Sequence, residues 1–318
     1  MLSRRHLGRS GITVAPLMFG CNVFGWTADE ATSFRMLDAF VAGGFNAIDT
    51  ADVYSRWVPG HEGGESETII GKWLASRQAR DKVVIATKVG SDMGPAGKGL
   101  SKAHITAAVE ASLKRLQTEY IDLYQSHIDD DSAPVEETLQ TYAELIQAGK
   151  VRAIGASNFT AARLAQSLTA SRTLGLPRYE TLQPEYNLME RAGFEAELQG
   201  LCAQESIGAI TYFSLAKGFL TGKYRSEADL GKSLRGGGVK AYLVSGRGKA
   251  VLAALDEIAA ETKATSAQVA LIWLMSRPAV GAPIASATSL PQLEEIMGSA
   301  RLLLSSEAIA KLTAASST

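Results

Sequence analysis

The sequence of 318 residues has little cysteine, almost no net charge and no long apolar stretch. Its two cysteines, Cys21 and Cys202, are too few for a disulfide framework or a metal-binding cluster, so a reducing compartment is the simpler expectation. The formal net charge of −1 offers no excess of positive charge to nucleic acid or to an anionic membrane surface. No segment approaches the roughly 20 apolar residues of a membrane-spanning helix. These shortages favour neither a nucleic-acid partner nor a membrane.

The remaining composition is that of an ordinary globular protein, with 46% hydrophobic residues and 30 glycines. The segment Ser3–Leu7 carries the paired arginines of an export signal, but Gly8 and Gly11 interrupt the apolar stretch that such a signal requires. We therefore expect a cytoplasmic protein. Because α/β barrels of this length commonly form one unit, residues 1–318 are expected to be a single domain.

Short apolar runs alternate with longer segments of helical period along most of the chain. The runs predict strands at Leu17–Gly20, Asn46–Asp49, Val83–Lys88, Ile121–His127, Ala153–Ser157, Thr181–Gln183, Ala209–Phe213 and Pro283–Ser286. Helices are predicted at Ala31–Ala42, Glu67–Leu74, His104–Leu116, Val135–Ala148, Ala161–Leu174, Phe194–Gln204, Ala267–Met275 and Leu290–Met297. Eight strand–helix units match the closure of a parallel barrel, so the predicted fold is α/β, a (β/α)8 TIM barrel.

An open, doubly wound sheet is the structural alternative. It would carry a glycine-rich phosphate loop after its first strand, and neither Gly43-Gly44 nor Gly60–Gly64 has the G-x-G-x-x-G spacing of that loop. The barrel is therefore preferred.

Three segments stand outside the eightfold alternation. Leu7 and Ile12–Val14 flank a glycine-containing turn and predict an N-terminal β-hairpin. Leu252–Ala260 predicts an inserted helix before the seventh barrel helix. Ser226–Arg247 has no clear period and follows the seventh strand, so we expect a mobile loop that covers the site.

Several predicted strands end in polar residues. Asp49 ends the second strand, with Tyr54 shortly after it, Lys88 ends the third and His127 the fourth. Taken singly, an aspartate forms turns, a lysine lies at the surface and a histidine packs in a core. Because all strands of a barrel end on one rim, we expect the four residues to converge there.

These four residue types, which we call the tetrad, form a complete set for carbonyl reduction. A phenol has a pKa near 10, and an adjacent ammonium lowers it so that Tyr54 can deliver a proton to the carbonyl oxygen. Asp49 would hold Lys88 charged, and a neutral His127 would donate a hydrogen bond to the same carbonyl. One imidazole and one carboxylate make a poor metal site, so no metal is expected.

The sequence resembles the aldo-keto reductase superfamily over essentially its whole length, and within it the bacterial branches and the related β-subunits of potassium channels. The matching segments are Phe45–Tyr54, Ala86–Lys88, Ile121–His127, Ile154–Phe159, Gln183–Leu188 and Tyr212–Tyr224. The resemblance implies that Tyr54 is the general acid/base, that Lys88 and Asp49 tune it, and that His127 orients the substrate carbonyl.

The resemblance also implies a nicotinamide cofactor site. Its implied contacts are Gly20, Cys21 and Asn22 beside the nicotinamide, Ser157, Asn158 and Gln183 at its carboxamide, Tyr212 stacked on the ring, Ser214, Leu215, Ala216, Lys217 and Gly218 around the pyrophosphate, and Lys223, Arg235, Ser286, Thr288, Gln292 and Glu295 around the adenosine phosphate. Asp49 and Phe213 are further implied cofactor contacts.

Two departures from the family pattern bear on the cofactor. Thr288 stands where many members have arginine or serine, and Ile296 where most have asparagine. A lost guanidinium removes a charge-assisted contact to a 2′-phosphate. NADP(H) stays favoured through Lys223 and Arg235, and NAD(H) stays an alternative.

The resemblance thus implies an NADP(H)-dependent oxidoreductase that interconverts an aldehyde, ketone or sugar carbonyl with its alcohol, as a monomer or homo-oligomer. Phe24, Trp26 and Trp57 are the expected substrate-pocket walls. Two alternatives stay open. One is a redox-sensing, cofactor-binding regulatory subunit with little turnover. The other is a barrel lyase that forms a Schiff base on Lys88.

Overall fold

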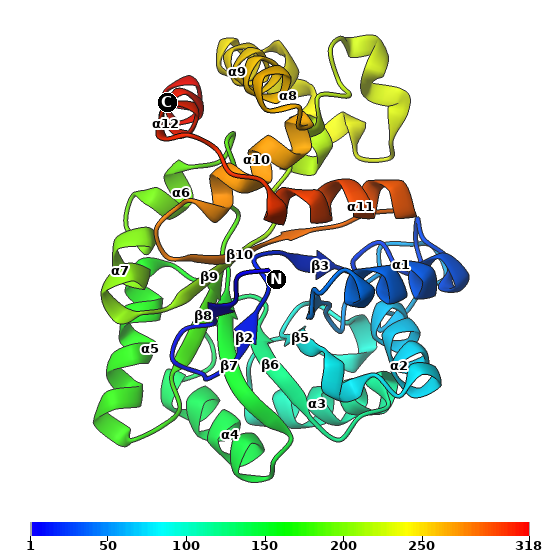
Figure 1. Ribbon diagram of the computed structural model, residues 1–318. Coiled ribbons are helices and arrows are strands. Elements are labelled where there is room, and N and C mark those ends of the chain that lie inside the picture. The colour runs from blue at the N-terminus through cyan, green and yellow to red at the C-terminus, as the bar shows by residue number, and fades with distance from the viewer. Residues whose placement is uncertain (1, 318) are drawn as a thin grey trace.

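Eight parallel strands close into a barrel in the computed structural model, which describes residues 2–317 (Figure 1). The barrel strands are β3 (Met18–Gly20), β4 (Ala47–Asp49), β5 (Val84–Val89), β6 (Ile121–Ser126), β7 (Val151–Ser157), β8 (Tyr179–Gln183), β9 (Gly208–Thr211) and β10 (Val280–Ala285). Neighbouring strands follow chain order, and β10 closes the ring against β3. The (β/α)8 barrel predicted from the sequence is confirmed.

Helices surround this barrel. The ring consists of α1 (Glu30–Ala42), α2 (Glu65–Arg77), α3 (Lys102–Leu116), α4 (Val135–Gln147), α5 (Ala161–Leu174), α6 (Ala192–Glu195), α7 (Leu198–Glu205), α10 (Ser266–Met275) and α11 (Leu290–Gly298). The predicted inserted helix is α9 (Gly246–Thr262), directly before α10. The single helix predicted over Phe194–Gln204 is instead divided into α6 and α7. A final helix, α12 (Ser306–Ala315), was not predicted.

Side-chain caps explain where several helices begin. Ser101 accepts a hydrogen bond from the His104 amide at the start of α3. Thr160 caps α5, which leaves the neighbouring Asn158 side chain available for other contacts. Thr265 caps α10 and forms a capping box with Gln268.

The predicted hairpin closes the amino-terminal end of the barrel. Its strands, β1 (Arg5–His6) and β2 (Thr13–Val14), pair antiparallel in front of the barrel opening in Figure 1. Leu7, Ile12 and Val14 are buried in one cluster with inward-facing barrel residues such as Met18 and Leu123. One end of the barrel is therefore filled by apolar side chains.

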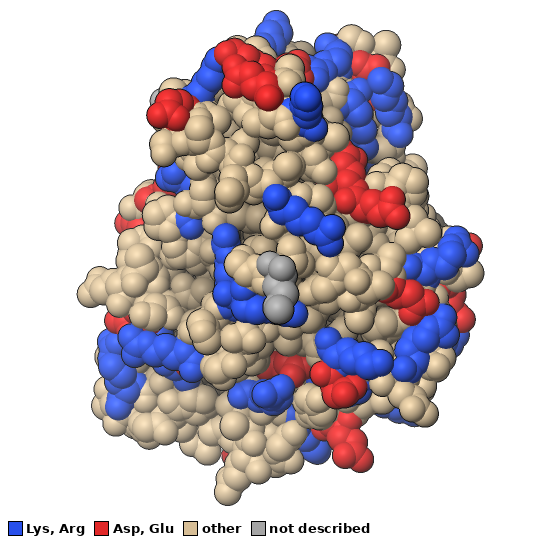
Figure 2. All heavy atoms as spheres, viewed as in Figure 1, with Lys and Arg blue, Asp and Glu red and all other residues tan. Residues whose placement is uncertain are grey.

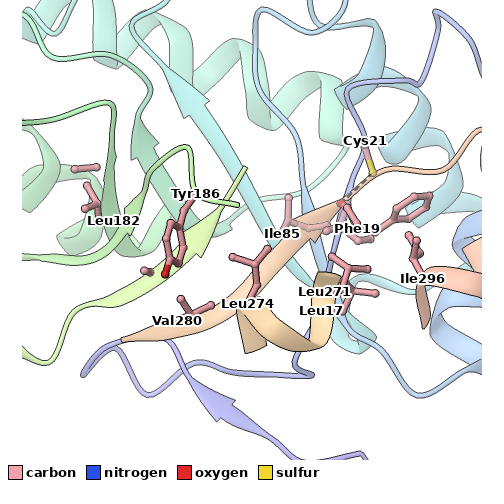
Figure 3. Close-up of a cluster of buried hydrophobic side chains, with 14 of the residues drawn as sticks. Leu17, Phe19, Cys21, Ile85, Leu182, Tyr186, Leu271, Leu274, Val280 and Ile296 are labelled. Atoms are coloured by element: carbon pink, nitrogen blue, oxygen red, sulfur yellow. Dashed lines mark hydrogen bonds between the residues drawn. The ribbon is translucent and has the colours of Figure 1, made fainter. Parts of the chain in front are cut away.

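The main core lies between the barrel and the helices. In Figure 3, Leu271 and Leu274 of α10 point toward Val280, Leu17 and Ile85 of the barrel region. The outer side of α10 is covered too, since the Trp273 indole donates to Thr313 Oγ1 of α12 at 3.0 Å. Burial on both sides explains why α10 is apolar all round instead of amphipathic.

The segment expected to be irregular is built mainly from short helices. It contains two 3₁₀ helices, η4 (Glu227–Lys232) and η5 (Gly236–Val239), followed by α8 (Lys240–Val244), and lies at the edge of the molecule in Figure 1. A reciprocal capping box between Ser226 and Asp229 starts η4. The segment is therefore less irregular than expected, because short helical turns such as η4 can form through local capping and need no long hydrophobic period.

Charges of both signs are interspersed on the face of the molecule seen in Figure 2. Within residues 2–317, no helix combines the length and the apolar character needed to cross a lipid bilayer.

The contact between α2 and α3 gives a first prediction. A methyl group on Gly71 would collide with the Arg115 carbonyl oxygen and lie 2.7 Å from the Leu116 carbonyl carbon, both main-chain atoms that cannot rotate away. Gly71→Ala should therefore lower the free energy of unfolding by about 1–3 kcal/mol or more, measured by chemical denaturation. Gly200→Ala in α7 is the control, because its methyl group meets nothing within 4 Å and should be neutral or slightly stabilising. Equal effects of the two substitutions would contradict this packing argument.

Candidate active site

Three members of the tetrad are linked by hydrogen bonds at the carboxyl end of the barrel. Asp49 is the last residue of β4, Lys88 lies near the end of β5, and Tyr54 is in the loop after β4. Lys88 Nζ lies 2.7 Å from Asp49 Oδ2 and 3.2 Å from the Tyr54 hydroxyl. It also donates to the Thr50 carbonyl oxygen at 2.8 Å. The convergence expected from barrel topology is thus present for these three side chains.

Electrostatics around Lys88 favour a charged amine. Burial disfavours the ammonium, but Asp49 and the Tyr54 oxygen outweigh that cost and raise the pKa of Lys88 above its usual value. Burial also raises the pKa of Tyr54, while the Lys88 charge pulls it down and Asp49 adds to the rise. From the sequence, Lys88 is expected to lower the pKa of Tyr54 below that of a free phenol. In the structure Lys88 only reduces the increase in the pKa of Tyr54, because burial has the larger effect.

His127 follows β6 and faces Tyr54. The two ring centroids lie 6.0 Å apart in an edge-to-face arrangement. Burial, with the Lys88 charge, lowers the pKa of His127 to about 3, so the imidazole is neutral near pH 7. Its buried Nδ1 has no hydrogen-bond partner among residues 2–317. A neutral ring of this kind can donate one hydrogen bond to an oxygen beside the Tyr54 hydroxyl.

The amide-bearing residues predicted from the resemblance form a second hydrogen-bonded group next to the tetrad. Gln183 donates to Asp49 Oδ1 at 2.9 Å, so both oxygens of that carboxylate are bonded. Ser157 donates to the Gln183 carbonyl at 2.9 Å. Asn158 donates to the His127 carbonyl and accepts from the Tyr212 hydroxyl, each at 2.9 Å. The ends of β4, β6, β7, β8 and β9 are therefore tied together.

The turn after β9 has an unusual backbone. Phe213, Ala216 and Lys217 have φ values of 49°, 48° and 58°, and Gly218 has 96°. Left-handed backbone is costly for residues other than glycine, and three such residues within one turn outside a helix cap are unusual. Such turns direct main-chain N–H groups into a concavity that suits an anion. Within the turn, Ser214 is buried and donates to the Thr211 carbonyl, and Leu215 is half-buried.

Lysine side chains lie beside this turn. Lys217 Nζ lies 5.2 Å from the Phe213 ring centroid. The exposed Lys223 extends along the Tyr224 ring at 5.0 Å and borders Gly218. Positive charge therefore accompanies the strained backbone.

The remaining predicted cofactor residues lie along β3, β10 and α11. The Cys21 amide donates to the Asp49 carbonyl at 2.9 Å, which places Gly20 and Cys21 beside the tetrad. Ser286 donates to Asn22 Oδ1 at 2.7 Å, and Thr288 donates to Gln292 Oε1 at 3.0 Å through its hydroxyl. Glu295 is half-buried, and its carbonyl accepts from Gln268. Burial raises the pKa of the Cys21 thiol well above its ordinary value, which disfavours the thiolate form.

Two of the three predicted pocket residues form an aromatic wall with Tyr54. Trp57 meets Tyr54 edge-to-face at 5.7 Å, and Trp26 meets Trp57 in the same way at 5.6 Å. Phe24 differs, because it is fully buried and its ring packs against Phe19 at 5.5 Å. Its ring belongs to the core beneath the site and not to a pocket wall.

Arg235 lies by this wall. Its guanidinium carbon is 5.5 Å from the Trp26 ring centroid. The resemblance placed Arg235 with the adenosine phosphate, whereas its contact here is with a predicted substrate-pocket residue.

A buried carboxyl group, Asp52, was missed in the sequence. Asp52 is 2% exposed, and neither of its carboxylate oxygens has a hydrogen-bond partner within the described chain. Burial, with the neighbouring Glu67 carboxylate, raises the pKa of Asp52 to about 8. Glu67 itself is bonded to Arg115 and Thr87. The only available signal was a second aspartate three residues after Asp49, which a turn explains equally well.

A separate cavity of about 470 Å³ is lined by Ser10, Arg152, Leu176 and Arg178, among others. It lies on the hairpin side, and none of the predicted site residues lines it. The chemistry is therefore assigned to the opposite end of the barrel.

Asp52 gives a prediction about pH and stability. The folded state keeps the Asp52 proton up to about pH 8, whereas the unfolded chain loses it near the ordinary value of 3.8. The unfolded state therefore binds fewer protons across this window, and wild-type stability falls as the pH rises through it. The Asp52→Asn variant has no proton to lose at this position. Its free energy of unfolding, relative to that of wild type, should therefore rise by about 1–3 kcal/mol between roughly pH 5 and pH 8. One titrating group changes the free energy of unfolding by at most ~1.4 kcal/mol per pH unit.

Denaturant unfolding at both pH values measures this difference. Asp131→Asn, at an exposed aspartate, is the control and should leave the pH dependence unchanged. If Asp52→Asn and wild type lose stability in parallel, Asp52 is ionised in the folded protein.

Comparison with known proteins agrees with the geometry. The pattern that defines the Aldo/keto reductase family matches residues 16–317. An uncharacterized oxidoreductase of Bacillus subtilis, YrpG, is 33% identical over 315 residues, which cover 96% of this chain and 94% of that protein. The aldo-keto reductase YhdN of the same organism is 36% identical over 294 residues, 90% of this chain and 84% of its own length.

A probable voltage-gated potassium channel subunit beta of Arabidopsis thaliana is 34% identical over 302 residues, which cover 92% of this chain and 89% of that protein. The closed barrel, the hydrogen-bonded tetrad members and this match over nearly the whole chain lead to one conclusion: the chain belongs to the Aldo/keto reductase family.

Proposed function

We propose that the protein is an NADP(H)-dependent oxidoreductase that interconverts a small carbonyl compound and the corresponding alcohol. The observation that carries this proposal is the position of Lys88 Nζ, within hydrogen-bond distance of both Asp49 and the Tyr54 hydroxyl. This arrangement joins an ionisable phenol to a fixed positive charge at a solvent-facing rim.

The residues present fit a nicotinamide dinucleotide. The positive-φ turn at Phe213–Gly218, with Lys217 and Lys223 beside it, suits a pyrophosphate. Asn158 and Gln183 offer amide groups beside the tetrad for a carboxamide, and the half-buried Tyr212 ring offers a stacking face. When bound, NADP(H) supplies or accepts the hydride.

Each tetrad residue then has a proton or positioning task. Tyr54 delivers its hydroxyl proton to the carbonyl oxygen in reduction and removes it from the alcohol in oxidation. Lys88 stabilises the phenolate that remains, and Asp49 keeps the ammonium charged and oriented. The neutral His127 donates a hydrogen bond to the same oxygen, which fixes the carbonyl over the phenol.

The Schiff-base alternative is disfavoured by the state of Lys88. Its amine is fully buried, donates three hydrogen bonds and is held charged, whereas a nucleophilic amine must be neutral and reach the substrate. The regulatory alternative keeps some support from the similarity to a probable channel subunit. Measurement of turnover decides between the regulatory role and the catalytic role.

Removal of the Tyr54 hydroxyl tests the catalytic proposal. Tyr54→Phe should lower kcat by about 10²-fold or more, the usual effect of losing a general acid, while NADPH binding measured by fluorescence stays within about threefold of wild type. The assay follows NADPH consumption with a panel of aldehydes, ketones and sugars, and NADP reduction with the matching alcohols. A wild-type protein that binds NADPH but turns over no member of the panel would support the regulatory role instead.

Lys223 tests the cofactor preference. If its ammonium pairs with the adenosine phosphate, Lys223→Met should raise the Kd for NADPH by about 10-fold or more and leave the Kd for NADH within about threefold. Lys240→Met is the control, since Lys240 is an exposed lysine of the same region that already pairs with Glu227. Equal losses of affinity for NADPH and NADH would instead mean that Lys223 contacts a part of the molecule that both cofactors share.

A further inference from the structure

The peptide group that follows Tyr54 is held on both sides by the start of α2. The Tyr54 carbonyl accepts from the Gly64 and Ser66 amides at 3.0 Å and 3.2 Å. The Ser55 amide donates to Oε2 of Glu65, the first residue of α2, at 3.1 Å. The main chain beside the phenol is therefore fixed by a helix as well as by strand β4.

The Glu65 carboxylate uses both of its oxygens to bind this loop. Besides the bond from Ser55 to Oε2, its Oε1 accepts from the Glu62 amide at 2.9 Å and from the Gly63 amide at 3.2 Å. Burial opposes the charge of Glu65, but the main-chain amides of Glu65, Glu62, Gly63 and Ser55 lower the pKa of Glu65 below its ordinary value. Glu65 is therefore an ionised acceptor that joins the loop after Tyr54 to the helix.

No cation accounts for the Glu65 carboxylate. Within residues 2–317, no lysine or arginine pairs with it, and Nδ1 of His61 lies 3.9 Å from its Oε1, beyond hydrogen-bond distance. Two residues further on, Glu67 is by contrast bonded to Arg115. The described partners of Glu65 are main-chain amides between residues 55 and 63, so its contribution is to the position of that segment.

The Tyr54 hydroxyl depends on this support, because its one described hydrogen-bond partner is Lys88. Their separation of 3.2 Å is the longest of the three hydrogen bonds that Lys88 makes. The Tyr54 ring meets Trp57 and His127 edge-to-face, with centroids 5.7 Å and 6.0 Å away. A displacement of the main chain at Ser55 is therefore passed to the hydroxyl. A shift on the order of 1 Å at a reacting group can lower a rate by about 10²-fold.

We infer that Glu65 is a positioning residue, whose bond to the Ser55 amide keeps the Tyr54 hydroxyl in place. It acts through Tyr54, which stays in reach of Lys88, and is not itself an acid or base of the reaction. This inference rests on the proposed function, because an effect on turnover requires that Tyr54 transfers the proton.

The test replaces Glu65 by glutamine. Glu65→Gln keeps the size of the side chain but has one oxygen for the three amides, and its own N–H groups then face amides that also donate. The variant should lower kcat by about 10-fold or more, while the KM for the carbonyl substrate and the Kd for NADPH stay within about threefold. This split separates positioning of the phenol from a general loss of structure, which would weaken cofactor binding as well.

Glu62→Gln is the matched control. It makes the same chemical change three residues earlier, and the exposed Glu62 side chain has no hydrogen-bond or ion-pair partner within the described chain. The Glu62 main-chain amide, which donates to Glu65, stays in place. The kcat of this variant should therefore stay within about twofold of wild type, as expected for a surface substitution.

A fluorine label on Tyr54 gives a readout that does not need turnover. A 3-fluorotyrosine side chain at this position carries the fluorine next to the hydroxyl, so its NMR resonance reports the surroundings of the phenol oxygen. Glu65→Gln should shift or broaden this resonance, and Glu62→Gln should leave it unchanged. A shifted resonance, together with a wild-type protein that turns over no substrate, would sustain the inference about position and refute the proposed function.

Three results would overturn the inference. One is an unchanged fluorine resonance in Glu65→Gln. Another is a kcat of Glu65→Gln within about twofold of an active wild type, the range of a surface substitution. The third is a parallel loss of kcat and of NADPH affinity, which would assign Glu65 to the stability of the loop as a whole.

Discussion

The buried ammonium of Lys88 is the constraint around which the site is arranged. A fully buried lysine stays charged only if its charge and its three N–H groups are all compensated, and Asp49, Thr50 and Tyr54 do this together. The third of these bonds determines where the phenol oxygen lies. Strand register is what allows it: Asp49 pairs with Ala86, two residues before Lys88, so both side chains point into the barrel.

The alternation of side chains along each strand also separates residues that stabilise the fold from residues that carry the chemistry. Ala47, Ala86 and Leu123 point inward in the apolar cluster near the hairpin. Two residues further on, the same strands carry Asp49, Lys88 and Gln125, all buried and polar. One layer of the barrel interior is therefore apolar and holds the fold together. The next layer is polar and holds the reacting groups, so each strand contributes to both.

Much of this could be predicted from the sequence because it depends on local period. The eight strands and the convergence of Asp49, Tyr54 and Lys88 follow from the order of apolar runs and from closure of the ring. Burial by distant elements could not be predicted. The net rise in the pKa of Tyr54, the core position of Phe24 and the unpartnered Asp52 all depend on which side chains meet across the fold. Helix α12 was not predicted because Leu312 is its one buried residue in the structure, which leaves little apolar period to recognise in the sequence.

The hairpin formed by β1 and β2 makes the two ends of the barrel unequal. Because Leu7, Ile12 and Val14 fill one opening, small molecules can reach the polar layer only from the other end. The closed end is consequently a surface to which other molecules can be attached without blocking the entry of small molecules at the open end. Protein tethered to a bead or an electrode through the hairpin face would present its open end to the solution.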